Sequence, residues 1–127
     1  MTDMGTFTTC VAFAALGADE NRIELDSMLV DTGSEYSWIP GHLLVGLGIE
    51  PSETIEFEGT DGRIFERPIG GATAFASGRR SPTVVVFAQP GDMTLLGAHA
   101  LEGMNLRVDC LHKKLVPGGP VRAAVAA

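Results

Sequence analysis

MLVDTGS, residues 28–34, is an apolar run that ends in one carboxylic acid, followed by a hydroxyl and a glycine. The three apolar residues predict a buried strand. An acid delivered by a buried strand needs a partner or a chemical task, because burying an unpaired carboxylate is costly. The Thr32 hydroxyl can be fixed by hydrogen bonding, and Gly33 allows another backbone to approach closely. Asp31 is therefore the first candidate functional residue.

The second motif is TLLGA, residues 94–98, in which two leucines and a glycine precede an expected short helix. Together with Asp-Thr-Gly after an apolar strand, it resembles the retroviral-type (retropepsin-like) aspartic proteases, and most closely their small bacterial single-domain members. The resemblance extends over residues 6–117. It implies an all-β, retropepsin-like closed acid-protease barrel with one lobe per chain and one or two short helices. In such a fold Leu95, Leu96 and Gly97 lie behind the catalytic loop.

The resemblance also implies an activity, that of an aspartic endopeptidase, with Asp31, Thr32 and Gly33 as the catalytic residues. Hydrolysis by paired carboxylates needs two aspartates in one site, and Asp-Thr-Gly occurs once in these 127 residues. We therefore expect a homodimer that brings Asp31 of each subunit to the two-fold axis. Two carboxylates held this close share a proton, so one serves as base toward a water and the other as acid toward the scissile carbonyl of an extended peptide.

A second function remains open for the same fold, that of a catalytically silent dimer that binds peptides. The intact Asp31, Thr32 and Gly33 favour the enzyme, since a binding module has no need of an acid that is costly to bury. Neither function requires a cofactor. No metal site is expected, because His42, His99 and His112 are scattered and no pair of Cys or His residues has ligand spacing.

Residues 55–65 form an expected hairpin with Asp61-Gly62 at its tip, where tight turns require positive φ angles. By resemblance this hairpin is the flap that covers the substrate, although an ordinary surface hairpin is the alternative. The residues assigned by the resemblance to the flap and to substrate binding are Ser34, Gly59, Thr60, Asp61 and Gly62. The segment lacks the glycine-rich, apolar tip of the viral enzymes, which leaves substrate preference open.

Each residue just after the Asp-Thr-Gly motif allows two interpretations of its role. Ser34 either donates a hydrogen bond to the neighbouring carboxylate or is a turn serine. Glu35 is expected as an exposed loop acid, with contact to substrate backbone or to the other subunit as the alternative. Tyr36 and Trp38 are expected in the core or in a pocket wall.

The dimer departs from the viral pattern in one respect. Viral members carry an arginine after the glycine of the second motif, whereas this chain has Ala98 followed by His99. The ion pair made by that arginine is therefore absent. Dimerisation is expected to rest on the catalytic loops, with Thr32 gripping the opposite chain. The terminal segments 4–8 and 121–127 either interleave as strands or fray.

Composition and patterning favour one domain over residues 1–127, with a core of useful size and many tight turns. No linker, repeat or low-complexity tract divides the chain. Expected strands cover residues 6–16, 22–30, 54–58, 63–75, 82–87, 106–109 and 113–116, and expected helices cover residues 41–47 and 98–102.

Charge and cysteine content limit the partners and the cellular compartment that can be expected. The net charge of −7 argues against nucleic acid, whose phosphates demand clustered cations. There is no apolar stretch of about 18 residues, so no membrane partner is expected, and the chain is expected to be cytoplasmic. Cys10 is expected in the core and Cys110 to be partly exposed near a turn. A disulfide between them remains a minor alternative in a compartment that keeps thiols reduced.

Overall fold

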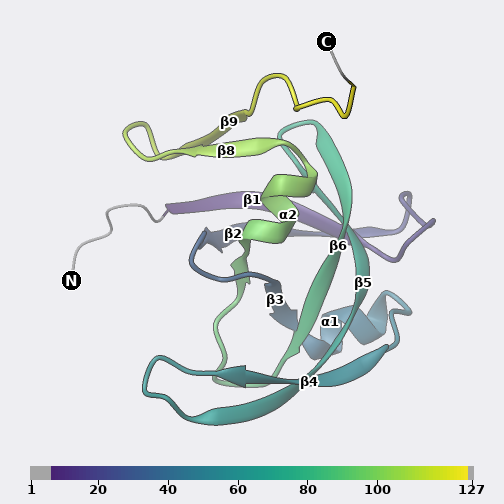
Figure 1. Cartoon of the computed structure of the whole chain (residues 1–127). Coiled ribbons are helices and arrows are strands. Elements are labelled where there is room, and N and C mark those ends of the chain that lie inside the picture. The colour runs from purple at the N-terminus through teal and green to yellow at the C-terminus, as the bar shows by residue number, and fades with distance from the viewer. Residues whose placement is uncertain (1–6, 126–127) are drawn as a thin grey trace.

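The computed structural model describes residues 7–125, which form mostly β-strand (Figure 1). The all-β expectation is confirmed, with two short helices. In chain order the elements are β1 (Phe7–Ala14), β2 (Arg22–Val30), β3 (Ser37–Pro40), α1 (Gly41–Gly46), β4 (Glu53–Glu58), β5 (Ile64–Ala76), β6 (Arg79–Ala88), β7 (Leu95–Leu96), α2 (Ala98–Gly103), β8 (Leu106–Asp109) and β9 (Lys114–Pro117).

Seven strands form one sheet in the order β1-β2-β7-β3-β6-β5-β4. The sheet closes on itself because the second half of β1 also pairs with β5, from Ala12 opposite Phe75 to Ala14 opposite Thr73. The long β5 therefore serves two neighbours, and its first residues extend past the ring to pair with β4. The ring leaves the β4–β5 hairpin projecting from the bottom of the view in Figure 1.

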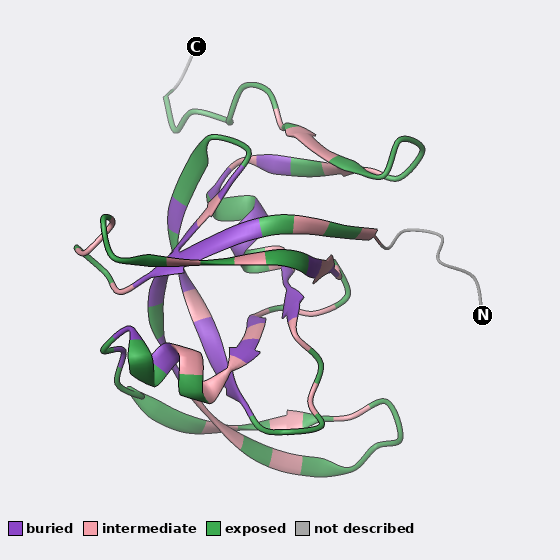
Figure 2. Ribbon diagram, turned by 180° about the vertical axis from the view of Figure 1, so that it is seen from behind, coloured by how far each residue is buried: buried purple, intermediate pink, exposed green. Residues whose placement is uncertain are grey.

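The buried residues lie along the strands of this ring, coloured purple in Figure 2, and together form one hydrophobic core. Its fully buried side chains come from strands that follow one another around the ring, including Phe13 of β1, Met28 and Val30 of β2, Val85 of β6 and Leu96 of β7. Continuous apolar runs are typical of strands covered on both faces. Met28 and Val30 are buried as predicted, whereas Leu29 between them is only partly buried, so the end of β2 is a core strand on one face.

The pairing of β2 with β7 brings the two sequence motifs together. β2 runs parallel to β7, with Leu29 opposite Leu95 and Val30 opposite Leu96. β3 runs parallel to β6, and it contacts β7 where Trp38 lies opposite Leu95. The strands of the two motifs therefore lie side by side, and β7, although only two residues long, links β2 to β3.

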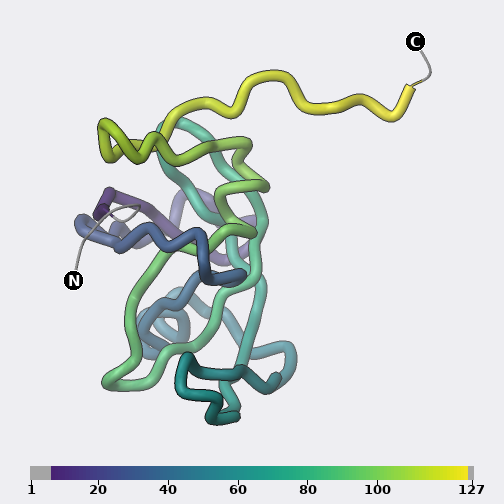
Figure 3. Tube along the Cα trace, turned by 60° about the vertical axis from the view of Figure 1, so that its left-hand side comes forward, coloured from purple at the N-terminus to yellow at the C-terminus, as the bar shows by residue number. Residues whose placement is uncertain are grey.

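The last part of the chain lies outside the large sheet. β8 and β9 form a two-stranded sheet of their own, and the residues after β9 run along an exposed path away from it (Figure 3). Residues 121–125 are irregular and exposed, so the structure shows no terminal strand there. The remaining terminal residues considered for interleaving, 4–6 and 126–127, lie outside the described residues.

The expectation that Cys10 belongs to the core is wrong. The first half of β1 alternates between partly buried and exposed residues, and Cys10 falls on an exposed position. A register irregularity between Thr9 and Val11 ends this alternation, and only the residues from Val11 onward are continuously buried. Cys110 is exposed after β8, and both cysteines are free thiols.

Within residues 7–125 no helix has both the length and the apolar character needed to cross a membrane.

Candidate active site

Asp31 follows the last residue of β2 and begins a tight loop. Its backbone N–H donates to the carbonyl oxygen of Leu96 at 3.0 Å, which ties the loop to β7. The loop turns at once, because the Ser34 N–H donates to the Asp31 carbonyl at 3.1 Å. Asp31 as a residue is partly buried, and its carboxylate Oδ1 accepts the Gly33 N–H at 2.9 Å in an exposed hydrogen bond. Backbone bonds at both ends therefore fix the position of this acid.

The apex of the loop faces outward. Thr32 and Gly33 are both exposed, so the residues next to the acid are accessible to another molecule. The Ser34 hydroxyl donates to the carbonyl oxygen of Tyr36 at 2.9 Å and does not serve the Asp31 carboxylate. Of the two interpretations of Ser34, the turn serine is therefore the one that the structure shows.

The second motif lies directly against this loop. The Gly97 N–H donates to the hydroxyl of Ser37 at 3.0 Å, and the Ala98 N–H donates to the Ser34 carbonyl at 2.8 Å. Ser37 is fully buried and was not singled out from the sequence. The sequence feature that could have identified Ser37 is a small polar residue at an inward position of the short apolar segment Ser37–Pro40.

Only glycine fits at position 97. A Cβ placed there would lie 2.4 Å from the Tyr36 carbonyl oxygen and 2.8 Å from that of Ser34. Real Cβ atoms do not approach backbone oxygens this closely, and backbone on both sides leaves little freedom to yield. The glycine of the second motif is therefore required by the contact between the two loops.

A cleft of about 600 Å³ opens next to the loop. One wall is the chain from Gly33 to Tyr36 together with Trp38, and the other is the β4–β5 hairpin, with Met93 beside it. Four aromatic rings contact one another across the cleft: Trp38 lies 5.0 Å from Phe57 and 6.3 Å from Phe65, and Tyr36 meets Phe57 edge to face at 6.5 Å. Tyr36 and Trp38 form a pocket wall, as expected.

The tip of the hairpin has the predicted turn. Gly62 has φ +83°, the Gly59 N–H donates to the Arg63 carbonyl at 2.9 Å, and the Asp61 carboxylate accepts the Arg63 N–H at 3.1 Å. Gly59 and Thr60 line the cleft, whereas Asp61 and Gly62 do not. Of the residues expected to form the flap and bind substrate, the structure therefore places Ser34, Gly59 and Thr60 in the cleft lining. The tip of the hairpin, Asp61 and Gly62, lies outside that lining.

β4 is the last strand of the sheet, and within residues 7–125 its outer edge has no partner strand. The cleft lining includes every residue from Ile55 to Gly59. A strand that has backbone N–H and C=O groups free along one edge is a template for an added strand. The outer edge of β4 is therefore open to the addition of a strand.

An ion pair joins the hairpin to the loop before β7. Arg67 donates to both carboxylate oxygens of Asp92, from Nε at 2.7 Å and from a terminal nitrogen at 2.9 Å. Because of these hydrogen bonds, the pKa of Asp92 lies below its ordinary value, and that of Arg67 is raised. The two residues lie 25 positions apart, so nothing in the sequence pairs them.

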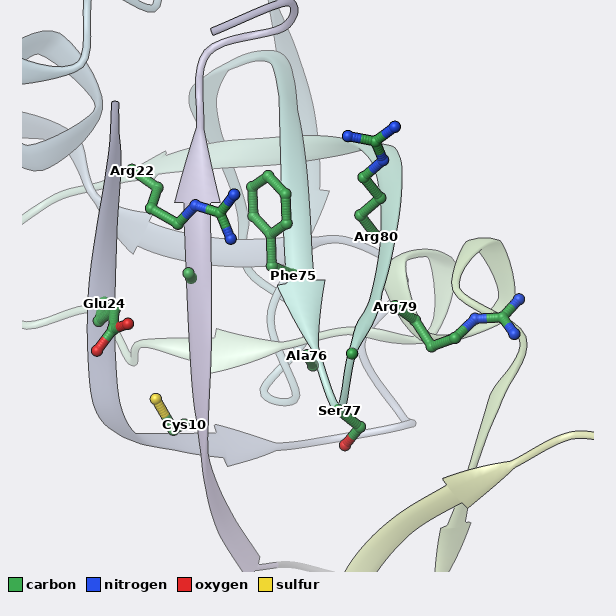
Figure 4. A pocket seen from close by; sticks show the side chains of 10 residues that line it. Cys10, Arg22, Glu24, Phe75, Ala76, Ser77, Arg79 and Arg80 are labelled. Atoms are coloured by element: carbon green, nitrogen blue, oxygen red, sulfur yellow. The ribbon is translucent and has the colours of Figure 1, made fainter. Parts of the chain in front are cut away.

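A second hollow, of about 530 Å³, has a different lining (Figure 4). It is formed by β1, β2 and the β5–β6 turn, with Phe75 under the guanidinium of Arg22 at 3.7 Å. On the same strands, ligand atoms of Cys10, Glu24 and Asp26 lie within 4.8 Å of one another, and all three residues are exposed. The sequence did not predict this group.

No family model and no curated protein matches this chain.

Proposed function

We propose that this protein is an aspartic endopeptidase that acts as a homodimer on extended peptides. The observation that carries the proposal is the placement of the Asp31 loop: the Asp31 carboxylate accepts the Gly33 N–H, and Gly33 and Ser34 of the same loop line a largely apolar cleft, although Asp31 itself is not among its lining residues. The retropepsin-like fold is part of the same proposal. The pairing of β2 with β7 beside the loop supports it.

The chemistry needs a second carboxylate, which the partner subunit's Asp31 would supply. The ionised acid takes a proton from a water as the water oxygen bonds to the scissile carbonyl carbon, while the protonated acid gives its proton to the carbonyl oxygen. The tetrahedral intermediate then collapses: the C–N bond breaks, the amine nitrogen receives a proton, and the dyad recovers its starting state. No covalent bond to the protein forms.

The cleft suits an extended peptide whose side chains are apolar on one face. Its strand edge supplies backbone hydrogen bonds, and its aromatic rings supply an apolar surface. The β4–β5 hairpin takes the place of the flap in this proposal. The two unpaired, exposed thiols support the cytoplasm as its compartment, because exposed thiols persist where the environment is reducing.

The alternative is a silent peptide-binding dimer of the same fold. The open edge of β4 favours it as much as it favours an enzyme, since strand addition needs no acid. Only turnover separates the two functions.

The test is digestion of a complex peptide mixture at several values from about pH 3 to about pH 8, read by mass spectrometry, with wild type beside Asp31→Asn. Cuts made by wild type and absent with the variant support the protease. If peptides are retained by the wild-type protein on a column but never cut, the binding module replaces it. If neither protein cuts or retains any peptide, both functions fail.

A further inference from the structure

The first residues of β5 leave the ring together with β4. From Ile64 to Pro68, β5 pairs with β4 alone, and its pairing with β6 begins at Ile69 opposite Val86. Arg67 therefore lies just before the point where the projecting hairpin joins the main sheet. A projecting two-stranded hairpin is marginally stable by itself and needs contacts at its base to hold one orientation.

The Arg67–Asp92 pair supplies such a contact. Both side chains are mostly buried, at 16% and 17% exposure, and the guanidinium meets the carboxylate with two hydrogen bonds. Asp92 is itself fixed, because its Oδ2 accepts the Gln89 N–H at 2.8 Å. A bidentate, charge-assisted pair in a partly desolvated position is among the stronger polar contacts in proteins.

The pair connects the hairpin wall of the cleft to the loop that leads into β7. On the hairpin side, the Arg67 guanidinium lies 4.8 Å from the ring centre of Phe65, which lines the cleft. On the other side, Asp92 precedes Met93, another lining residue, and the chain then enters β7. The carbonyl of Leu96 in β7 accepts the Asp31 N–H, so the Asp92 loop leads to the strand that holds the acid.

We propose that Arg67 and Asp92 form a latch that holds the β4–β5 hairpin over the cleft. They are positioning residues, because they act through the hairpin and through Phe65. Their effect on hydrolysis rests on the proposed function, whereas their effect on the hairpin does not. Breaking the latch lets the hairpin swing away from Trp38 while the rest of the sheet stays folded.

Trp38 reports on the hairpin directly. It is the only tryptophan in the chain, and its ring contacts Phe57 and Phe65 of the hairpin. When the hairpin opens, this indole becomes more accessible to a neutral quencher such as acrylamide. Amide exchange in residues 53–68 provides a second measure of the same opening.

The experiment compares wild type with Arg67→Gln and Asp92→Asn. We expect faster quenching of Trp38 and amide exchange in residues 53–68 about tenfold faster, from the loss of charge-assisted hydrogen bonds. The matched control is Asp19→Asn, which breaks the Arg80–Asp19 ion pair on a different part of the surface and leaves both measures unchanged. Arg67→Lys keeps the positive charge but cannot make the two-pronged hydrogen bond of the guanidinium, so its quenching and exchange rates should fall between those of wild type and Arg67→Gln.

Two outcomes would overturn the latch. One is quenching and exchange at wild-type values in both variants, with circular dichroism confirming that they are folded. The other is equal acceleration of exchange throughout the chain, which would make the pair a general stabiliser. Kinetics test the consequence separately: the latch variants raise KM more than they lower kcat. A wild type without hydrolytic activity refutes the proposed function and leaves the quenching result to decide the latch.

Discussion

At the scale of single residues, Asp31 carries the proposed chemistry. The hydrogen bonds that hold its loop do not depend on its charge, so its catalytic role can be tested without disturbing the fold. The Asp31 N–H and the Gly33 N–H both have partners that an asparagine at position 31 retains, since an amide oxygen accepts as a carboxylate oxygen does. We expect Asp31→Asn to lower kcat at least about a thousandfold, because it removes the general base. Peptide cleavage measured by mass spectrometry checks this.

The control for this variant is its stability and its oligomeric state. Urea unfolding and sedimentation should give wild-type values for Asp31→Asn. Retained turnover would show that Asp31 is not the catalyst, and a collapse of the fold would show that the acid is structural.

Gly97 is the residue whose replacement should harm the fold most directly. Because a Cβ at this position meets two backbone carbonyls, we expect Gly97→Ala to lower the free energy of unfolding by about 3 kcal/mol. Gly46→Ala is the matched control, since Gly46 lies at the end of α1 with nothing near its would-be Cβ. That control should be neutral or slightly stabilising. Urea unfolding of both variants gives the comparison, and equal stabilities would refute the steric argument.

At the scale of elements, the Arg67–Asp92 pair makes the attachment of the hairpin sensitive to pH. The pKa of Asp92 is lowered in the folded state by its hydrogen bonds to Arg67, so its contribution to stability is present above the ordinary pKa of about 3.9. The contribution is lost as pH falls through the lowered value. Asp61 and Arg63, which carry opposite charges, line the same hollow as this pair and also face Asp92 and Arg67 there.

We therefore expect Asp92→Asn to accelerate amide exchange in residues 53–68 about tenfold near neutral pH and progressively less below about pH 4. Amide exchange of wild type and variant over a pH series measures the difference. A difference that stays constant from neutral to strongly acidic solution would show that the charge of Asp92 contributes nothing.

The long strands and the short β8 and β9 could be predicted from the sequence, whereas β3 and β7 could not. The apolar run before Asp31 and the Asp61-Gly62 turn carry strong local signals, and the structure has a buried strand and a hairpin there. β3 and β7 are four and two residues long and exist because of tertiary pairing with β6 and β2. Cys10 was misplaced because an exposed alternation and a register irregularity in β1 leave no mark in composition.

The candidate site divides in the same way. Asp31, Gly33 and Gly97 were singled out from motifs, and at Gly97 the contact between the loops requires a glycine. The buried Ser37 and the Arg67–Asp92 pair were missed, since each depends on a partner distant in the chain: 60 positions for Ser37 and Gly97.

At the scale of the whole molecule, the proposal requires two chains. One chain presents a single Asp-Thr-Gly acid with exposed residues beside it, so activity should depend on the concentration of dimer. We expect specific activity to fall on dilution and Thr32→Ala to raise the dimer dissociation constant about tenfold through lost hydrogen bonds between the loops. Sedimentation equilibrium checks the second expectation. Thr54→Ala, another exposed threonine, is the control. A dissociation constant unchanged by Thr32→Ala would refute the proposed hydrogen bonds between the loops of the two chains.

The open edge of β4 has a cost for the molecule as well as a use. An edge that can pair with a peptide can also pair with the same edge of another copy, the first step toward aggregation. Glutamates stand along it: Glu56 and Glu58 are exposed, and Glu56 lies opposite Glu66 on β5. Like charges on two such edges repel each other, which opposes pairing between copies. The strand that would hold a substrate is therefore also the strand at which copies of the chain would join, and its glutamates bear on solubility as well as on binding.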